Sequence, residues 1–248
     1  MHTETLGRVT SPPLMMLHGW GQSLKQLKPL ADLLSSDFHI HLIDLPGFGL
    51  SYPPNEVWGT LDYAKRLLEY MDQHKIPKAS FLGHSFGGKV SLCLATTTPE
   101  RVENLILLAA SGMRRKRTFL NQCTFKAIGW AGKALKGIDK VCHTSFFTNH
   151  FIPRFGSADY KNAGSMRPIL VRTVNEDFSD QFPRISAKTL LIWGEDDAET
   201  PPEIGQRLHE MIPLSRLIVF PNKGHEPFQG VGAHLCAYHI LRTTGEGR

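Results

Sequence analysis

Two hydrophobic patterns alternate along this chain. Short runs that are apolar, or that alternate apolar and polar residues, predict strands; they lie at residues 14–18, 38–44, 79–82, 105–109, 190–193 and 217–220. Between them, apolar residues recur every three or four positions, which predicts helices; these lie at residues 23–35, 60–75, 89–96 and 233–241, with another beginning at Thr200-Pro201. This alternation is typical of an α/β fold with a mostly parallel central sheet flanked by helices.

The pattern changes between residues 112 and 182. This stretch has no strand pattern and is rich in Phe, Lys, Arg and Gly, which predicts a helical insertion in a core formed by residues 1–111 and 183–248. It contains twelve Lys and Arg against five Asp and Glu, a charge of +7, while the remaining sixteen Lys and Arg and eighteen Asp and Glu give −2. A basic insertion on a weakly acidic core argues against general nucleic-acid binding and permits contact with an acidic partner.

Composition places the chain among folded globular proteins. Of its 248 residues, 41% are hydrophobic and 21% charged, which excludes a disordered chain and a coiled coil. No apolar run approaches the roughly 20 residues that span a bilayer, and the first residues carry no signal-peptide pattern. The four cysteines form no CxxC pair, so we expect free thiols in a reducing compartment and a cytoplasmic location.

The most specific local motif is Gly83-His84-Ser85-Phe86-Gly87, which stands between a predicted strand and a predicted helix. This G-x-S-x-G pattern is typical of a tight strand-to-helix turn that lifts a nucleophilic serine clear of the sheet. The turn places the hydroxyl at a helix N-terminus, where backbone N–H groups favour negative charge. A glycine-rich turn with a solvated serine is the competing interpretation.

A serine hydroxyl needs a general base, and His225 is the best placed candidate. It follows the predicted strand at residues 217–220 in a loop, and such loops assemble at the carboxyl edge of a parallel sheet. The other downstream histidines lie in predicted helices: His209, His234 and His239.

The base needs an acid, and the chain offers acids in one suitable loop. After the strand at residues 190–193 comes the run Glu195-Asp196-Asp197-Ala198-Glu199, whereas Ala110-Ser111-Gly112 after the strand at residues 105–109 contains no carboxylate. We therefore expect the acid to come from residues 195–199, which leaves more than one candidate open. A solvated acidic loop is the alternative interpretation.

The oxyanion of an acyl transfer also needs donors. In this arrangement one donor is the N–H of Phe86, directly after Ser85, and the second comes from the loop His18-Gly19-Trp20-Gly21, most simply the Trp20 N–H. His18 itself is expected to organise that loop. We expect no cofactor. We also expect no metal ion, because His39 and His41, which share one face of a predicted strand, are too few ligands for a metal site.

These motifs occur together and in order: HGWG from His18, DLPGFGLS at residues 44–51, GHSFGG from Gly83, WGEDDAETP from Trp193 and GH at Gly224. In this set the chain resembles the α/β-hydrolase fold family over most of its length. The resemblance implies Asp197 as the triad acid, with Asp196 as the runner-up. It also implies that residues 112–182 form a helical cap after the sixth strand. About a dozen residues precede the first strong strand, so the usual leading hairpin is shortened or reduced to one strand.

The resemblance also narrows the activity. Haloalkane dehalogenases and epoxide hydrolases of this family use Asp where this chain has Ser85, so those activities are disfavoured. We expect a serine hydrolase, in particular a carboxylesterase of the EC 3.1.1 type, that cleaves a small-molecule carboxylic ester through an acyl-enzyme on Ser85. Lactonases and C–C bond hydrolases are alternatives, and a small-molecule receptor with a retained triad is the non-enzymatic one.

A narrower resemblance concerns the basic insertion. HGWG, DLPGFGLS, the compact N-terminus and the +7 insertion together resemble pimeloyl acyl-carrier-protein methyl ester esterases, in which a basic cap receives an acidic carrier protein. The run Arg114–Arg117 would be part of such a surface. One departure is His84, which stands where the best-known member has Trp.

Overall fold

A computed structural model describes residues 1–113, 119–142, 144–146, 149–150, 154 and 157–245, and the chain divides into two compact units. The first unit joins Met1–Met113 to Arg172–Arg248, and the second is Arg114–Val171. The range 112–182 expected for a cap contains the second unit, but residues 172–182 belong to the first. The role of the second unit as a cap stays a prediction, and the basic residues 114–117 lie outside the described residues.

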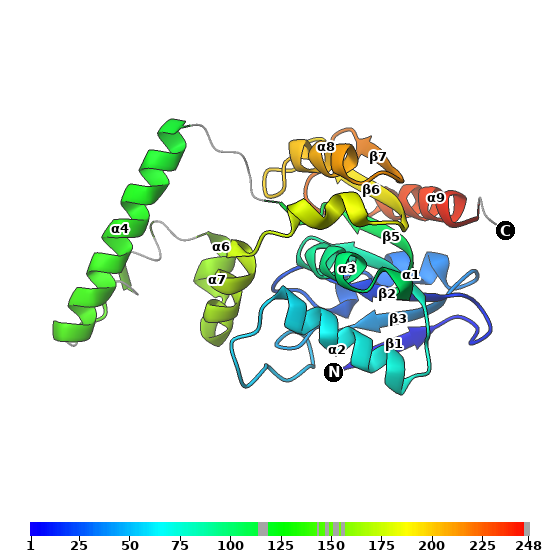
Figure 1. The fold of residues 1–248 in the computed structure, drawn as a ribbon, viewed down its shortest axis with the longest axis horizontal. Helices are drawn as coiled ribbons and strands as arrows, with labels where there is room; N and C mark the ends of the chain where they lie inside the picture. Colours follow the sequence, from blue (N-terminus) through cyan, green and yellow to red (C-terminus); the bar gives the residue numbers. More distant parts are fainter. Residues whose placement is uncertain (114–118, 143, 147–148, 151–153, 155–156, 246–248) are drawn as a thin grey trace. The chain divides into compact units, whose positions relative to one another are not determined.

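The first unit is built on a seven-stranded sheet in the order β1-β3-β2-β4-β5-β6-β7 (Figure 1). β1 runs antiparallel to β3, and all other neighbours are parallel. The strands are β1 (Thr3–Leu6), β2 (Pro13–Leu17), β3 (His39–Ile43), β4 (Ala79–His84), β5 (Val102–Leu108), β6 (Lys188–Gly194) and β7 (Ser215–Phe220). The predicted mostly parallel sheet is confirmed.

Helices cover both faces of this sheet (Figure 1). One face packs on η1 (Leu24–Gln26), α1 (Lys28–Leu34) and α9 (Val231–Gly245), and the other on α2 (Thr60–Gln73), α3 (Phe86–Thr97) and α8 (Pro202–Met211). Alternate residues of each strand point to opposite faces, and the central strands are apolar on both. Leu190 and Ile192 of β6 therefore join the α1–α9 core, whereas Trp193 contacts Gly205 of α8.

Three features differ from the sequence pattern. The helix expected at residues 23–35 is divided into η1 and α1 near Pro29, which has no N–H to donate within a helix. α8 begins at Pro202, directly after Thr200-Pro201. The insertion expected after the sixth strand follows β5, the fifth strand of the structure.

Most helices of the insertion belong to the second unit. α4 (Phe119–Cys142), α6 (Ala158–Asn162) and η4 (Gly164–Met166) belong to the second unit, and α7 (Arg167–Asn175) leads from it into the first. Within the first unit, the ammonium group of Lys89 donates to the carbonyl oxygens of Thr173 and Glu176. The Glu176 carboxylate in turn accepts from the Thr60 N–H at 2.8 Å. These bonds fix the carboxyl end of α7 to α2 and α3.

Two short helices, η2 (Pro99–Arg101) and η5 (Ser179–Arg184), complete the elements of the core. None of the helices formed by the described residues is both long enough and apolar enough to cross a lipid bilayer.

The parallel strands β2, β4, β6 and β7 end at the same edge of the sheet, and each is followed by a motif singled out in the sequence. The residues with candidate chemistry therefore gather at this edge although they lie far apart in the chain.

Candidate active site

Ser85 occupies a strained turn between β4 and α3. Its backbone has φ 47° and ψ −110°, a combination that L-residues rarely adopt. The backbone is also packed too closely here for a side chain. A Cβ atom on Gly83 would lie 2.4 Å from the carbonyl oxygen of Gly87, and a Cβ atom on Gly87 would lie 2.3 Å from the carbonyl oxygen of Leu17. The two glycines of the G-x-S-x-G pattern are therefore required by space.

Hydrogen bonds hold this turn in place. The Ser85 N–H donates to the carbonyl oxygen of Leu108 at 3.0 Å, and the Ser85 carbonyl accepts from the N–H groups of Lys89 and Ser111 at 3.1 and 3.0 Å. Strand β5 and helix α3 thus fix the serine from both sides. The hydroxyl is presented at the N-terminus of a helix, as the sequence predicts.

The loop after β2 runs directly beside this turn. The Gly87 N–H donates to the His18 carbonyl at 3.1 Å, and a Cβ on Gly19 would lie 3.5 Å from the Ser85 Cβ. Within the described part of the chain, the backbone N–H groups of Trp20 and Phe86 make no hydrogen bond. Two unused donors therefore stand in the two segments where an oxyanion hole is expected.

His18 organises this loop. Its Nδ1 donates to the Gly19 carbonyl at 2.7 Å, and its Nε2 accepts from the Leu45 N–H at 3.0 Å. Burial lowers the pKa of His18, so the ring is neutral and both nitrogens are used. The ring therefore connects the loop after β2 to the loop after β3.

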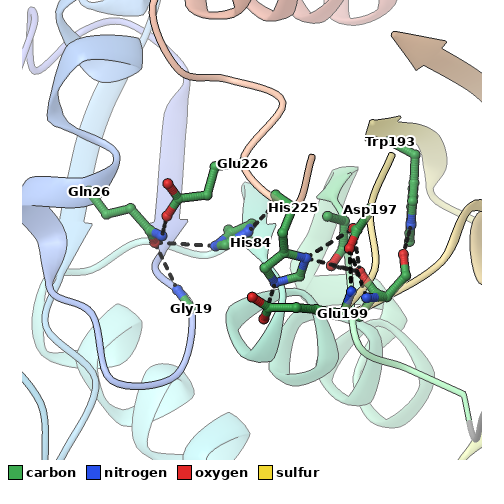
Figure 2. Close-up of polar contacts among 10 residues, drawn as sticks. Gly19, Gln26, His84, Trp193, Asp197, Glu199, His225 and Glu226 are labelled. Carbon is green, nitrogen blue, oxygen red and sulfur yellow. Dashed lines mark hydrogen bonds and ion pairs between the residues drawn. The ribbon is translucent and has the colours of Figure 1, made fainter. Parts of the chain in front are cut away.

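The structure brings Asp197 and His225 together. Asp197 Oδ2 lies 2.9 Å from His225 Nδ1, and its Oδ1 accepts from the backbone N–H groups of Glu199 and Thr200, both at 2.9 Å (Figure 2). The Asp197 side chain is completely buried and that of His225 is 15% exposed. Asp196 is exposed instead, and its N–H donates to the Lys223 carbonyl.

The hydroxyl of Thr200 completes the surroundings of this carboxylate. Its Oγ1 lies 2.8 Å from Asp197 Oδ2, 3.2 Å from His225 Nδ1 and 3.0 Å from the Ala109 carbonyl oxygen at the end of β5. In the sequence pattern, Thr200 indicates only the beginning of a helix. The side chain in fact ties the acid-bearing loop to the neighbouring strand.

The two partners shift each other's pKa in opposite directions. Burial alone would raise the pKa of Asp197, but hydrogen bonds from His225 and Thr200 and the charge of His225 bring it below the ordinary value. Burial alone would lower the pKa of His225, but the hydrogen bond and charge of Asp197, together with Glu199 and Glu226, raise it above the ordinary value. The arrangement stabilises an imidazolium, which a general base becomes when it accepts a proton.

The second ring nitrogen of His225 faces a different carboxylate. Within the described residues, His225 Nε2 makes no hydrogen bond to the Ser85 hydroxyl; Glu199 Oε2 lies 3.5 Å from it (Figure 2). Hydrogen bonds of this kind are often long in unliganded enzymes and shorten when the substrate binds. The serine and the acid–base pair therefore lie at one edge of the sheet without being directly bonded.

A polar network that sequence reasoning missed joins these loops. His84 Nε2 donates to the His225 carbonyl at 2.9 Å, Gln26 Nε2 donates to Glu226 Oε1 at 2.6 Å, and the Gly19 N–H donates to Gln26 Oε1 at 3.1 Å (Figure 2). Burial and the charge of His225 lower the pKa of His84 to about 3, which keeps that ring neutral. Nothing in the sequence spacing relates Gln26 to Glu226, since 200 positions separate them.

No group of three or more His, Cys, Asp or Glu side chains among the described residues is arranged to hold a metal ion. The polar groups at this edge are a serine hydroxyl, a histidine bonded to a buried carboxylate, and backbone N–H groups. Such a set can transfer an acyl group and move protons with the chain's own side chains.

Two family models match the chain. One, described as alpha/beta hydrolase fold, matches residues 12–124, and the other, described as TAP-like protein, matches residues 165–243. Together they cover most of both sequence segments of the core and all the motifs named above.

Individual proteins are also similar to most of this chain. A Nitrosomonas europaea protein named pimeloyl-[acyl-carrier protein] methyl ester esterase is 27% identical over 92% of this chain and 93% of its own length. Two solved structures are similar in fold. The enol-lactonase of Burkholderia xenovorans has a TM-score of 0.74 at 20% identity, with 98% of this chain and 95% of that chain covered. A meta-cleavage product hydrolase of Pseudomonas fluorescens has a TM-score of 0.72 at 20% identity, covering 99% and 94%.

The Asp197–His225 contact can be tested without substrate. Replacing Asp197 by Asn removes both the charge and the anionic acceptor, so the pKa of His225 should fall. The measurement is a pH titration of the His225 ring signals by NMR. Asp196→Asn, which removes the same charge from the neighbouring position, is the control. An equal fall in both variants would contradict the pairing described here.

Proposed function

Since the chain is a hydrolase of the α/β-hydrolase fold family, we propose that it cleaves carboxylic esters through an acyl-enzyme on Ser85. The observation that carries the proposal is the contact of the buried Asp197 with His225, at the edge of the sheet where the strained Ser85 turn also lies. A strained serine, an oriented histidine and two unused backbone donors are the parts that acyl transfer requires.

In the acylation step Ser85 Oγ attacks the carbonyl carbon of the ester, and its proton passes to His225 Nε2. Asp197 keeps Nδ1 protonated and stabilises the positive charge of the ring. The bond to the leaving oxygen then breaks, and the proton on Nε2 passes to that oxygen. The products of this step are a free alcohol and an ester of Ser85.

The carbonyl oxygen becomes negative in both steps, and the N–H groups of Trp20 and Phe86 are proposed to stabilise it. Removing one such donor typically costs about 3 kcal/mol of transition-state stabilisation. In deacylation, water loses a proton to His225 Nε2 and attacks the acyl carbon, and the proton returns to Ser85 as the acid leaves. All proton transfers thus use one nitrogen of one ring.

A narrower proposal concerns the substrate. The Nitrosomonas europaea relative is named for a methyl ester held on an acyl-carrier protein, and it matches nearly the full length of this chain. Residues 112–182 carry +7 in this chain. We propose that an acidic carrier protein presents the ester and contacts the basic insertion.

Ester hydrolysis should be lost in Ser85→Ala, because no other group replaces the nucleophile. The measurement is turnover over a panel of esters that vary in acyl length and alcohol, with a fluorophosphonate probe as a second readout. Wild type should be labelled at Ser85, and the variant should not be labelled. Labelling that persists in Ser85→Ala would show that the nucleophile is misassigned. Ligand-dependent thermal stabilisation without turnover of any ester would indicate a receptor.

Replacing Asp197 by Asn should lower kcat by roughly 10⁴, because the histidine then adopts the wrong tautomer, as in a serine protease. Asp196→Asn should have a far smaller effect, since that side chain is exposed and, among the ion pairs of the described residues, His225 is paired with Asp197 and Glu199 instead. Steady-state kinetics on one ester checks both variants. Equal or reversed losses would move the acid to Asp196.

The carrier proposal predicts a salt dependence that a small neutral ester does not share. Attraction between an acidic carrier and the insertion is screened over about 8–10 Å at physiological salt, so kcat/KM for a carrier-linked methyl ester should fall as salt rises. Changing Arg114, Arg115 and Arg117 to Ser should weaken this dependence, whereas changing them to Lys should preserve it. If the carrier-linked ester is hydrolysed no better than the free ester, the carrier is not a partner.

A further inference from the structure

Glu199 occupies an unusual position for an exposed acidic side chain. Its backbone N–H donates to Asp197 Oδ1 at 2.9 Å, which fixes the origin of the side chain on the turn that carries the acid. Its carboxylate reaches back toward the site, and Oε2 lies 3.5 Å from His225 Nε2 (Figure 2). His225 thus has one carboxylate at each ring nitrogen, and only one of them is buried.

The nitrogen that faces Glu199 is the one that handles the leaving group. Under the proposed function, Nε2 delivers its proton to the oxygen of the departing alcohol, so that oxygen must come within about 3 Å of Nε2. Substituents on the alcohol then lie within a few ångströms of the Glu199 carboxylate. The acyl part of the ester, attached to the other side of the carbonyl carbon, is farther from this charge.

The other charged groups around His225 are already engaged. Asp197 is bonded to Nδ1 and Thr200, and the carboxylate of Glu226 accepts from the amide groups of Gln26 and Gln229. The neighbouring ring of His84 is neutral, since burial lowers its pKa. Among the described residues, His225 is the only ion-pair partner of Glu199. Whenever the ring is neutral and ready to accept a proton, the Glu199 charge is left uncompensated.

We propose that Glu199 selects substrates by the charge of the leaving alcohol, favouring a cationic alcohol over a neutral one and disfavouring an anionic one. The proposal rests on the proposed ester hydrolysis and adds to it how the site ranks charged alcohols against neutral ones, of which the methanol of a methyl ester is an example. Two unit charges about 4 Å apart in water change a rate or binding constant about fivefold, and this sets the expected size of the effect. Because Glu199 is exposed, salt should reduce it.

The experiment compares esters that share one acyl group and differ only in the alcohol. The alcohols are choline, its uncharged isostere 3,3-dimethylbutanol, and the anionic 2-hydroxyethanesulfonate. The quantity measured is the ratio of kcat/KM for each charged ester to that for the neutral one. Wild type should prefer the choline ester by about fivefold at low salt and should discriminate against the sulfonate by a similar factor.

Three variants test the source of this preference. Glu199→Gln should bring both ratios toward one, and Glu199→Lys should invert them. Glu203→Gln removes the same charge from the exposed first turn of α8, which forms no ion pair with His225 among the described residues, and should leave the ratios as in wild type. Ratios that are the same in wild type, Glu199→Gln and Glu199→Lys would overturn the proposal.

A binding measurement separates this proposal from the proposed function. Choline and 3,3-dimethylbutanol are titrated into the protein, and the His225 ring signal is followed by NMR. Choline should bind about fivefold more tightly than the neutral alcohol to wild type and equally to Glu199→Gln. If wild type hydrolyses none of the esters, ester hydrolysis is wrong, and the binding preference still decides the role of Glu199. Equal binding of both alcohols to wild type would overturn that role.

Discussion

The backbone of Ser85 is held in a conformation that costs roughly 1–3 kcal/mol, and the surrounding structure depends on that turn. Strand β4 must end there, α3 must begin at the next residue, and two glycines must leave room for neighbouring carbonyl groups. The loop after β2 can run beside the serine because the Gly87 N–H holds the His18 carbonyl. Local strain at one residue therefore determines where three segments of the chain meet.

The second constraint is electrostatic. A completely buried carboxylate is unfavourable unless its oxygens are bonded, and Asp197 uses two backbone N–H groups, a threonine hydroxyl and a histidine for this purpose. The same bonds fix the orientation of the histidine ring. On the other side of the ring, the described residues give the exposed carboxylate of Glu199 no hydrogen bond. The ring therefore lies between a buried, hydrogen-bonded carboxylate and an exposed one.

Much of this arrangement can be read from the sequence because it depends on local rules. The apolar runs that form β2, β4, β5 and β6 are buried on both faces, and the elbow glycines are close to the serine in the chain. The hydrogen bonds between side chains of different loops cannot be predicted in this way. Gln26 meets Glu226, and Thr200 meets the end of β5, only because the strands bring their carboxyl ends together. Such contacts follow from the three-dimensional arrangement and leave no periodicity in the sequence. The short, half-exposed β1 likewise gives little hydrophobic signal.

The second unit interrupts the chain between two strands that pair directly with each other. β5 and β6 are hydrogen-bonded neighbours, although Arg114–Val171 lies between them in sequence. The entropy lost on closing a flexible loop grows only with the logarithm of its length, so doubling such an insertion adds only about 0.6 kcal/mol. The return of the chain to the core is secured separately, by the bonds of Lys89 to the end of α7. A change in the length of the inserted segment should therefore cost the core little free energy, because neither the pairing of β5 with β6 nor the bonds of the Ser85 turn involve residues of the second unit.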